Sequence, residues 1–222
     1  MMLSAVIPAL NAAATLPATL ESLIGADEIV LADGGSGDAT VSVAEGAGAR
    51  LVSSPPGRGR QLIAGAAAVR GDWLLFLHAD TRLAPEWRRA VDSFIADPAN
   101  LERGAVFTFA LDDDSAAAKR LAWSVNRRTD WFGLPYGDQG LLVSRPFYDS
   151  LGGYRPFPLF EDVDLVRRIG RARLTRLPVR AVTSAAAFRR DGYLRRSLRN
   201  LTLLTRYLAG ASPESLVEEY RR

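Results

Sequence analysis

Short apolar runs alternate with helical patterns along the first hundred residues of the chain. Four runs typical of β-strands lie at residues 3–7, 28–32, 50–52 and 73–77, and each is followed by sequence with helical periodicity. Strands this apolar on both faces are typical of a parallel sheet covered by helices. The pattern therefore predicts an α/β fold whose ligand chemistry lies at the carboxyl ends of the strands.

The pattern changes in the second half, where we expect a mixed arrangement of strands and helices. The expected elements are a helix at 85–95, a strand at 105–110, a helix at 115–128, a strand at 141–144 and a helix from 162. Leucines then recur at helical spacing among arginines from 194 to 208, which predicts an amphipathic helix.

The composition indicates one domain in a reducing compartment. With 222 residues, 48% of them hydrophobic, the chain can form one sizeable core but is short for two, so we expect a single domain over 1–222. The lack of cysteine excludes disulfides and thiolate metal sites. No run approaches the roughly 18 apolar residues of a membrane span, and the N-terminus does not resemble a signal peptide. We expect a cytoplasmic protein.

Charge is distributed unevenly along the chain. Residues 1–164 contain 14 basic and 21 acidic side chains, a net charge of −7, whereas residues 165–222 contain 14 basic and 4 acidic ones, a net charge of +10. Such a basic segment suits a diphosphate or an anionic membrane surface, which would place the protein at the inner face of the membrane. A solvated arginine-rich face is equally compatible. Nucleic acid is the one anionic partner that we do not expect.

Two motifs place carboxylates at strand ends. In EIVLADGGSGDAT, Asp33 enters a Gly-rich turn, where it either accepts hydrogen bonds from a nucleotide or belongs to an ordinary turn. In LLFLHADT, the fourth strand ends at His78 and Asp80, which share a face. A hard cation that bridges a diphosphate needs few protein oxygens, so Asp80 is a candidate ligand. His78 is either a second ligand or a packed side chain.

Two further clusters of polar residues lie in the second half. PLFEDVDLVRRI places three carboxylates, among them Asp162, at the start of a helix, where the helix dipole favours anions. Capping requires only one of them, so another is available as a general base. GLPYGDQG predicts either a tight loop or a pocket wall built from Tyr136, Asp138 and Gln139.

Together these motifs resemble those of family 2 glycosyltransferases with the GT-A fold. SAVIPALN, EIVLADGGSGDAT, GRGRQL, LLFLHADT, GDQG and FEDVDL occur in the family's order, up to about residue 171. The wording of GRGRQL, LLFLHADT, PYGDQG and EDVDL is most similar to small bacterial members associated with arsenosugar biosynthesis. The resemblance implies a single-domain, Rossmann-like, mostly parallel sheet with helices on both faces. It further implies a nucleotide-sugar half at about 1–110 and an acceptor half at about 111–222.

The resemblance also implies an activity and a set of residues. It predicts a hexosyltransferase-like enzyme that moves a sugar from a nucleotide diphosphate sugar to an unknown acceptor by an inverting displacement that depends on Mn²⁺ or Mg²⁺. The residues expected to bind the donor are Pro8, Asn11, Asp33, Arg60, Gln61 and Asp80. Asp80 and His78 would hold the metal, although many family members carry Asp in place of His78. Asp162 and Glu161 would be the catalytic residues, with Asp162 the expected general base and Glu161 the alternative.

Two other functions fit parts of the pattern. A sugar nucleotidyltransferase would also need a metal and a nucleotide pocket, but it typically begins with a Gly-rich, basic loop after the first strand. Here that position has PALNAAATL, which contains no glycine, lysine or arginine. An inactive module that only binds nucleotide sugars would have no need of both Asp80 and Asp162. A glycosyltransferase is therefore the favoured prediction.

Overall fold

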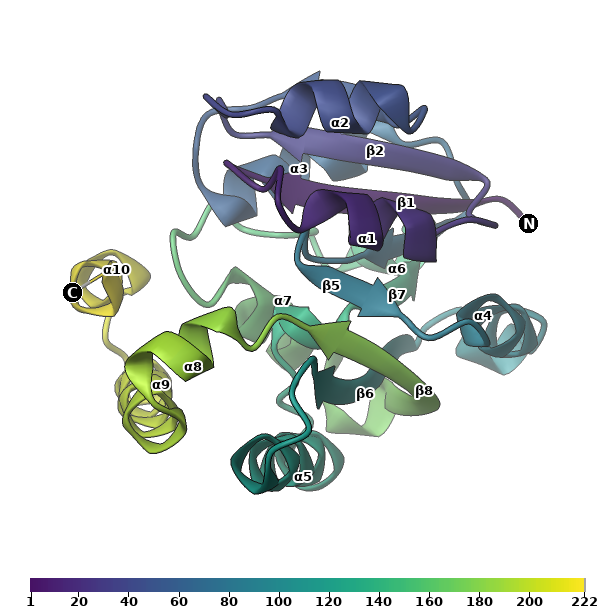
Figure 1. Cartoon of the computed structure of the whole chain (residues 1–222). Coiled ribbons are helices and arrows are strands. Elements are labelled where there is room, and N and C mark those ends of the chain that lie inside the picture. The colour runs from purple at the N-terminus through teal and green to yellow at the C-terminus, as the bar shows by residue number, and fades with distance from the viewer. Residues whose placement is uncertain (222) are drawn as a thin grey trace.

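One eight-stranded sheet runs through residues 1–221, the part of the chain that the computed structural model describes (Figure 1). The strands are β1 Leu3–Ala9, β2 Glu28–Asp33, β3 Arg50–Ser53, β4 Trp73–Phe76, β5 Thr81–Leu83, β6 Gly104–Leu111, β7 Leu141–Ser144 and β8 Leu174–Thr183. Their order in the sheet is β3-β2-β1-β4-β7-β6-β8-β5. The first four strands are parallel, whereas β7 is antiparallel to both of its neighbours.

Helices surround this sheet and extend beyond it at the C-terminal end. They are α1 Leu16–Ser22, α2 Thr40–Gly46, α3 Arg58–Ala68, α4 Trp87–Ile95, α5 Ala116–Phe132, α6 Arg145–Ser150, α7 Glu161–Ile169, α8 Ala186–Asp191, α9 Tyr193–Leu208 and α10 Pro213–Arg221. Short 3₁₀ turns occur at η1 Pro98–Asn100, η2 Gly137–Gln139 and η3 Arg171–Arg173. None of the helices within residues 1–221 has the length and apolarity needed to cross a membrane.

Side chains alternate between the two faces of the sheet, and each face has its own core. Leu3 and Ile7 of β1 belong to a buried cluster that includes residues of α1, α2 and α4. Val6 belongs to the opposite cluster, with residues of α3, α6 and α7. A Cβ at Gly65 would lie 2.4 Å from Val6 Cγ1, so this glycine allows α3 to pack closely on β1. The predicted coverage of the parallel strands on both faces is confirmed.

The predicted strands and helices all occur, with ends that shift by a few residues. The helix expected at 85–95 begins at Trp87, and the one expected from 162 begins at Glu161. The pattern did not predict β5 or β8. β8 contains Pro178 and pairs with β6, which lies about 70 residues earlier in the chain. The mixed second half is confirmed by the antiparallel pairing of β7 with β4.

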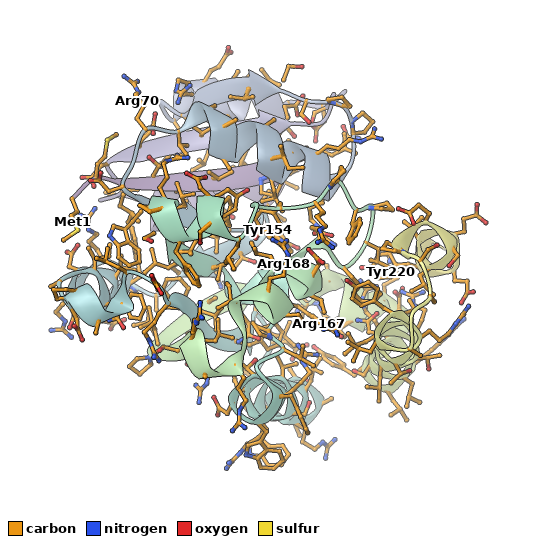
Figure 2. The ribbon with its side chains drawn as sticks, turned by 180° about the vertical axis from the view of Figure 1, so that it is seen from behind. Met1, Arg70, Tyr154, Arg167, Arg168 and Tyr220 are labelled. Atoms are coloured by element: carbon orange, nitrogen blue, oxygen red, sulfur yellow. The ribbon has the colours of Figure 1, made fainter. Side chains whose placement is uncertain are left out.

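The C-terminal helices lie on the side of the molecule to which β1 and β2 point (Figure 1). Leu203 and Leu204 of α9 and Leu216 of α10 form a third buried cluster, which also contains Phe160 and Val163 from the start of α7. Figure 2 shows Tyr220 on the side of α10 that faces the rest of the molecule. This packing brings α9 and α10 next to the carboxyl ends of the parallel strands.

Candidate functional site

The loops that follow the first two strands are tied together by polar side chains. Gln61 is buried, and its Nε2 donates to Ala9 O at 2.6 Å and to Ala32 O at 3.0 Å, where β1 and β2 end. Asn11 has a φ of 51° and accepts a hydrogen bond from Gly37 N at 2.9 Å through Oδ1. Gln61 and Asn11 therefore hold the loops of the expected donor site in place, since their side-chain amides bond to protein backbone.

Asp33 also bonds within its own loop. Its Oδ2 accepts from the backbone N–H groups of Gly35 and Ser36, both at 3.0 Å, and its Oδ1 accepts from the Ser36 hydroxyl at 2.5 Å. The carboxylate thus fixes the Gly-rich turn after β2. A contact between Asp33 and a nucleotide stays a prediction.

An acidic cavity of about 180 Å³ lies at the carboxyl edge of the sheet. The predicted site residues in its wall are His78, Asp80, Tyr136, Asp138 and Asp162. They come from the segment between β4 and β5, from the segment around η2 and from the start of α7. The structure therefore brings together residues that are up to 84 positions apart in the sequence. We refer to this hollow as the acidic cavity.

Asp162 is held in the cavity wall by two backbone groups. Gly137 N donates to its Oδ2 at 2.6 Å, and Val163 N donates to its Oδ1 at 2.7 Å. Gly137 has no room for a side chain, because a Cβ there would lie 2.4 Å from His78 Nε2 and 3.4 Å from Asp162 Oδ2. The close approach of this glycine therefore sets the positions of both the imidazole and the carboxylate.

Glu161 faces away from the cavity although it is adjacent to Asp162. Its carboxylate is fully buried and forms an ion pair with Arg58 of α3, while Oε2 has no hydrogen-bond partner within the described chain. Burial raises the pKa of Glu161, and the cation of Arg58 opposes this rise. Arg58 lines the acidic cavity and Glu161 does not. The structure thus gives the two acidic neighbours different surroundings.

Asp80 and His78 occupy different positions in the wall. The Asp80 side chain is exposed, yet enough protein surrounds it that burial raises its pKa, opposed in part by its own backbone N–H and by the cation of Arg58. Burial and the nearby Arg58 lower the pKa of His78 to about 3, so the imidazole is neutral at physiological pH. A neutral imidazole is able to ligate a metal, but its edge packs against Gly137.

Asp138 is the most perturbed carboxylate in the acidic cavity. Burial, followed by repulsion from Asp162 and Asp80, raises its pKa to about 7, and Arg128 and Arg58 oppose the rise. Its Oδ1 is buried without a hydrogen-bond partner among residues 1–221. Such a group is a candidate for ligand binding or proton transfer.

Tyr136 and Gln139 flank Asp138 in sequence but differ in their surroundings. Tyr136 lines the cavity, burial raises its pKa to about 12, and Arg128 lies over its ring at 3.7 Å. Gln139 is fully buried; its Oε1 accepts from Thr129 Oγ1 at 2.8 Å and its Nε2 donates to Phe107 O at 3.0 Å. The expected place of Gln139 in the pocket wall is therefore corrected: both ends of its amide bond to protein, so it supports η2 from behind.

A second, more open hollow of about 600 Å³ adjoins the acidic cavity. Its wall contains the predicted donor residues Pro8, Arg60 and Gln61, and α10 contributes Tyr220. Arg58, Leu159 and Tyr220 line both hollows. Of the predicted donor residues, Pro8, Arg60 and Gln61 thus line this hollow, Asp80 lines the acidic cavity with Asp162, and Asn11 and Asp33 line neither.

Several residues that line the cavity were not among those that the sequence predicted for the site. Arg58 lies in GRGRQL, where Arg60 and Gln61 were the predicted residues, and the exposed Arg60 lies outside the acidic cavity. Arg196 and Asn200 come from α9, which was predicted only as an amphipathic helix. The helical spacing of leucines identified the element, but only the packing of α9 shows which of its polar residues reach the cavity.

The sequence of the chain is similar to a family model and to several known proteins. Residues 4–144 match the model of glycosyl transferase family 2. PGL/p-HBAD biosynthesis glycosyltransferases of Mycobacterium tuberculosis and Mycobacterium bovis are 41% identical over 93 residues, which cover 37% of this chain and 36% of theirs. The match thus spans about a third of the length of these relatives.

Solved structures share the fold over a larger part of the chain. Glucosyl-3-phosphoglycerate synthase from M. tuberculosis in complex with Mn²⁺ and UDP-glucose is similar with a TM-score of 0.58 and 20% identity, over 82% of this chain and 70% of that one. The same synthase with Mg²⁺ and UDP gives a TM-score of 0.57 at 21% identity, with the same coverage. The fold is thus that of GT-A enzymes. With more than half of its length matched by the family model, the chain belongs to glycosyl transferase family 2.

Relative to the wild type, the Asp138→Asn variant is expected to become progressively more stable as the pH rises from about 4 to 7. The folded pKa of Asp138 is about 7, above the value of about 3.9 for an unfolded Asp, so the folded state binds the proton more tightly. Its favourable contribution is complete below pH 4 and is lost as the pH rises through the folded pKa. Denaturant unfolding at pH 5, 6, 7 and 8 should show the difference between variant and wild type growing by up to about 1.4 kcal/mol per unit, then levelling off.

The exposed Asp114→Asn is the matched control for this experiment, because it removes one carboxylate from the surface. Its stability difference from the wild type should lack this trend. A flat profile for Asp138→Asn would show that Asp138 titrates alike in the folded and unfolded states.

Proposed function

We propose that the chain transfers a sugar from a nucleotide diphosphate sugar to an acceptor hydroxyl by a metal-dependent, inverting single displacement. Asp80 and the donor diphosphate hold the cation, and Asp162 is the general base. The observation that supports this best is the position of Asp80 and Asp162 in the wall of one cavity, next to the hollow that contains some of the predicted donor residues. The proposal includes nucleotide-sugar binding by about 1–110 and acceptor binding by about 111–222.

The cavity residues fit a hard divalent cation. The open carboxylate of Asp80 is an oxygen donor of the kind that Mn²⁺ and Mg²⁺ prefer. Within residues 1–221, no three His, Asp or Glu side chains cluster as a metal site. Asp80 would therefore hold the cation together with phosphate and water ligands, and the cation would supply positive charge against the leaving group. His78 is proposed as an additional ligand or as the packed neighbour of Asp80.

The transfer step follows from the carboxylate of Asp162. The acceptor O–H gives its proton to Asp162 as the acceptor oxygen bonds to the anomeric carbon of the sugar. The bond between that carbon and the diphosphate oxygen breaks, and its electron pair leaves with the nucleotide diphosphate. The backbone N–H groups of Gly137 and Val163 hold the carboxylate in one orientation. Arg58, fixed by Glu161, offers a positive charge between the two hollows to the diphosphate.

The donor is proposed to lie across Arg58, with its nucleotide in the hollow near Pro8 and Arg60. The similar synthase structures contain UDP and UDP-glucose, which makes UDP-sugars the first donors to test. Asn11, Asp33 and Gln61 would shape this hollow through the loops that they tie. Participation in arsenosugar biosynthesis stays a prediction that rests on the wording of the sequence motifs.

Asp80→Ala is expected to abolish the metal-dependent part of donor binding. Removing the open carboxylate takes away the protein's main oxygen ligand for the cation, so the affinity for UDP-glucose with Mn²⁺ should fall at least about tenfold. Calorimetry of UDP-glucose with Mn²⁺ and with excess chelator measures this, and Asp114→Ala is the matched surface control. Wild-type affinity that is unchanged in chelator, or an unimpaired Asp80→Ala protein, would rule out the metal role.

Asp162→Asn is expected to lower turnover by roughly 10² to 10⁴ and to leave donor affinity almost unchanged. The amide keeps the volume of the side chain and can still accept from Gly137 N, but it cannot take the proton. Donor hydrolysis measures the effect before an acceptor is known. Transfer or hydrolysis at a near wild-type rate would place the base elsewhere, with Asp138 the next candidate.

Two neighbours in the same motif serve as controls for Asp162. Asp164→Asn removes a carboxylate that is bound to Arg155 and Arg168 outside the cavity, so it should lower stability much more than turnover. Glu161→Gln should release Arg58 and therefore weaken donor binding more than turnover. Equal losses of turnover in all three variants would indicate that the motif acts through folding alone.

We also propose that the protein is cytoplasmic and contacts an anionic membrane surface at its periphery through α9. The support is the outer face of this helix, where Leu194, Leu198 and Leu208 are exposed and Arg195 and Arg206 flank them. Apolar side chains interspersed with arginines are typical of helices that lie in the membrane interface.

Leu194→Glu is expected to reduce flotation of the protein with phosphatidylserine vesicles at low salt several-fold, because it places a negative charge on this face. High salt should release the wild type, since it screens the arginines. Ile24→Glu is the matched control, because Ile24 is 77% exposed and Leu194 is 74% exposed, on different elements. The same flotation of both variants and the wild type, or none of the wild type, would contradict the membrane contact.

A further inference from the structure

A third hollow opens from the acidic cavity between α5 and α9. It has a volume of about 320 Å³, within the usual range for a ligand site. Tyr136, Asp138, Phe188 and Asn200 line both this hollow and the acidic cavity. Helix α5 packs against α9, and the two helices lie beside each other at the C-terminal side of the sheet (Figure 1). We refer to the hollow as the α5–α9 groove and to the four shared residues as its neck.

Beyond the neck, the wall of the groove is mainly apolar. Phe109, Leu121 and Val125 form one side, and Leu201 of α9 forms the other. The polar side chains there are Ser124 and Ser197. Arg128 also lines the groove, but it is turned to the neck, where it lies over the Tyr136 ring and its Nε donates to Leu134 O at 2.8 Å. The groove is therefore suited to an apolar group.

The neck and the Arg128 side chain beside it, in contrast, contain polar atoms without partners. Asp138 Oδ1, Asn200 Oδ1 and Arg128 Nη2 are buried and have no hydrogen-bond partner in the described part of the chain. Buried polar atoms in this state cost free energy until a ligand or water bonds to them. One hydroxyl can donate to Asp138 or Asn200 and accept from Arg128, so a head with two or more hydroxyls can bond to all three atoms.

The charges around the neck are balanced. Asp80, Asp138 and Asp162 line the acidic cavity at its inner end, but Arg58 and Arg196 line the same cavity. Arg128 adds a third cation from the groove wall. Because neither sign of charge predominates, an uncharged head with several hydroxyls suits the neck, where it can bond to the unpartnered polar atoms.

We infer that the acceptor is an uncharged, amphiphilic alcohol whose hydroxylated head lies at the neck and whose apolar portion lies in the α5–α9 groove. This inference rests on the proposed function, because it delivers the acceptor hydroxyl to the cavity that contains Asp162. The apolar portion gains binding energy from the walls of Phe109 and Leu121, remote from the bond that forms. The groove thus defines the substrate class of the acceptor by its shape and polarity.

Alkyl glucosides of increasing chain length are suitable probes, since each combines a hydroxylated head with an apolar tail. Calorimetry of the full-length protein with n-butyl, n-hexyl and n-octyl β-D-glucoside, below their micelle-forming concentrations, should show affinity rising by up to about fourfold per added methylene. Chain-length-independent affinity, or no binding of the octyl compound, would overturn the inference.

Two pairs of variants locate the binding. Leu201→Glu places a charge in the groove wall and should remove the dependence on chain length, whereas Leu198→Glu, on the same helix outside the groove, should retain it. Both leucines tolerate the change structurally, as they are 53% and 55% exposed. Ser124→Trp should fill the groove and weaken octyl glucoside binding at least tenfold, whereas Lys119→Trp, exposed on the same helix, should not. Identical behaviour within each pair would place the tail elsewhere.

The proposed function and the inference are tested separately. Affinity of the wild type for UDP-glucose with Mn²⁺, measured without any glucoside, concerns the donor site alone. Binding of octyl glucoside in the absence of nucleotide concerns the groove alone. If the donor binds with Mn²⁺ and the glucosides bind without regard to chain length, the function holds and the acceptor class is wrong. If the reverse occurs, the groove is a binding site of a protein with another activity.

Discussion

The ion pair between Arg58 and Glu161 joins the two halves of the site. Arg58 begins α3, which packs on the parallel strands, and Glu161 begins α7, behind the acidic cavity. Breaking a buried pair costs about 3–5 kcal/mol, and because the Arg58 side chain is 35% exposed the lower end applies. Gly59 reinforces the junction, since a Cβ there would lie 2.4 Å from Arg155 O. This contact therefore holds the starts of α3 and α7 next to each other, between the donor hollow and the acidic cavity.

The fold holds three acidic side chains close together in the acidic cavity. Asp80, Asp138 and Asp162 face the same space, and the rise in the pKa of Asp138 to about 7 shows the strain that burial and repulsion impose. The protein supplies Arg58 and Arg128 against this charge. A divalent cation, as proposed for the reaction, would reduce this repulsion further.

In the proposed reaction, the three hollows offer different environments to the donor, the transferred sugar and the acceptor. The open hollow near Pro8 and Arg60 is suited to a nucleotide, the acidic cavity to the sugar and its departing diphosphate, and the α5–α9 groove to an apolar acceptor. Helices α9 and α10 complete all three, through residues such as Asn200 and Tyr220. The basic C-terminal quarter of the chain thus contributes positive charge and also forms part of the walls of these hollows.

The sequence by itself determined all the strands except β5 and β8, most helices, and which carboxylates were the candidates for the site. Hydrophobic periodicity is local, so the parallel strands were predictable, and Asp80 and Asp162 stood out because they follow a strand and begin a helix. Only the tertiary structure decided that Gln61 and Gln139 bond to backbone and that Glu161 pairs with Arg58. Those partners lie 10 to 103 residues away along the chain. A polar residue has the same appearance in sequence whether it faces a ligand or a carbonyl, and only the meeting of distant segments distinguishes the two.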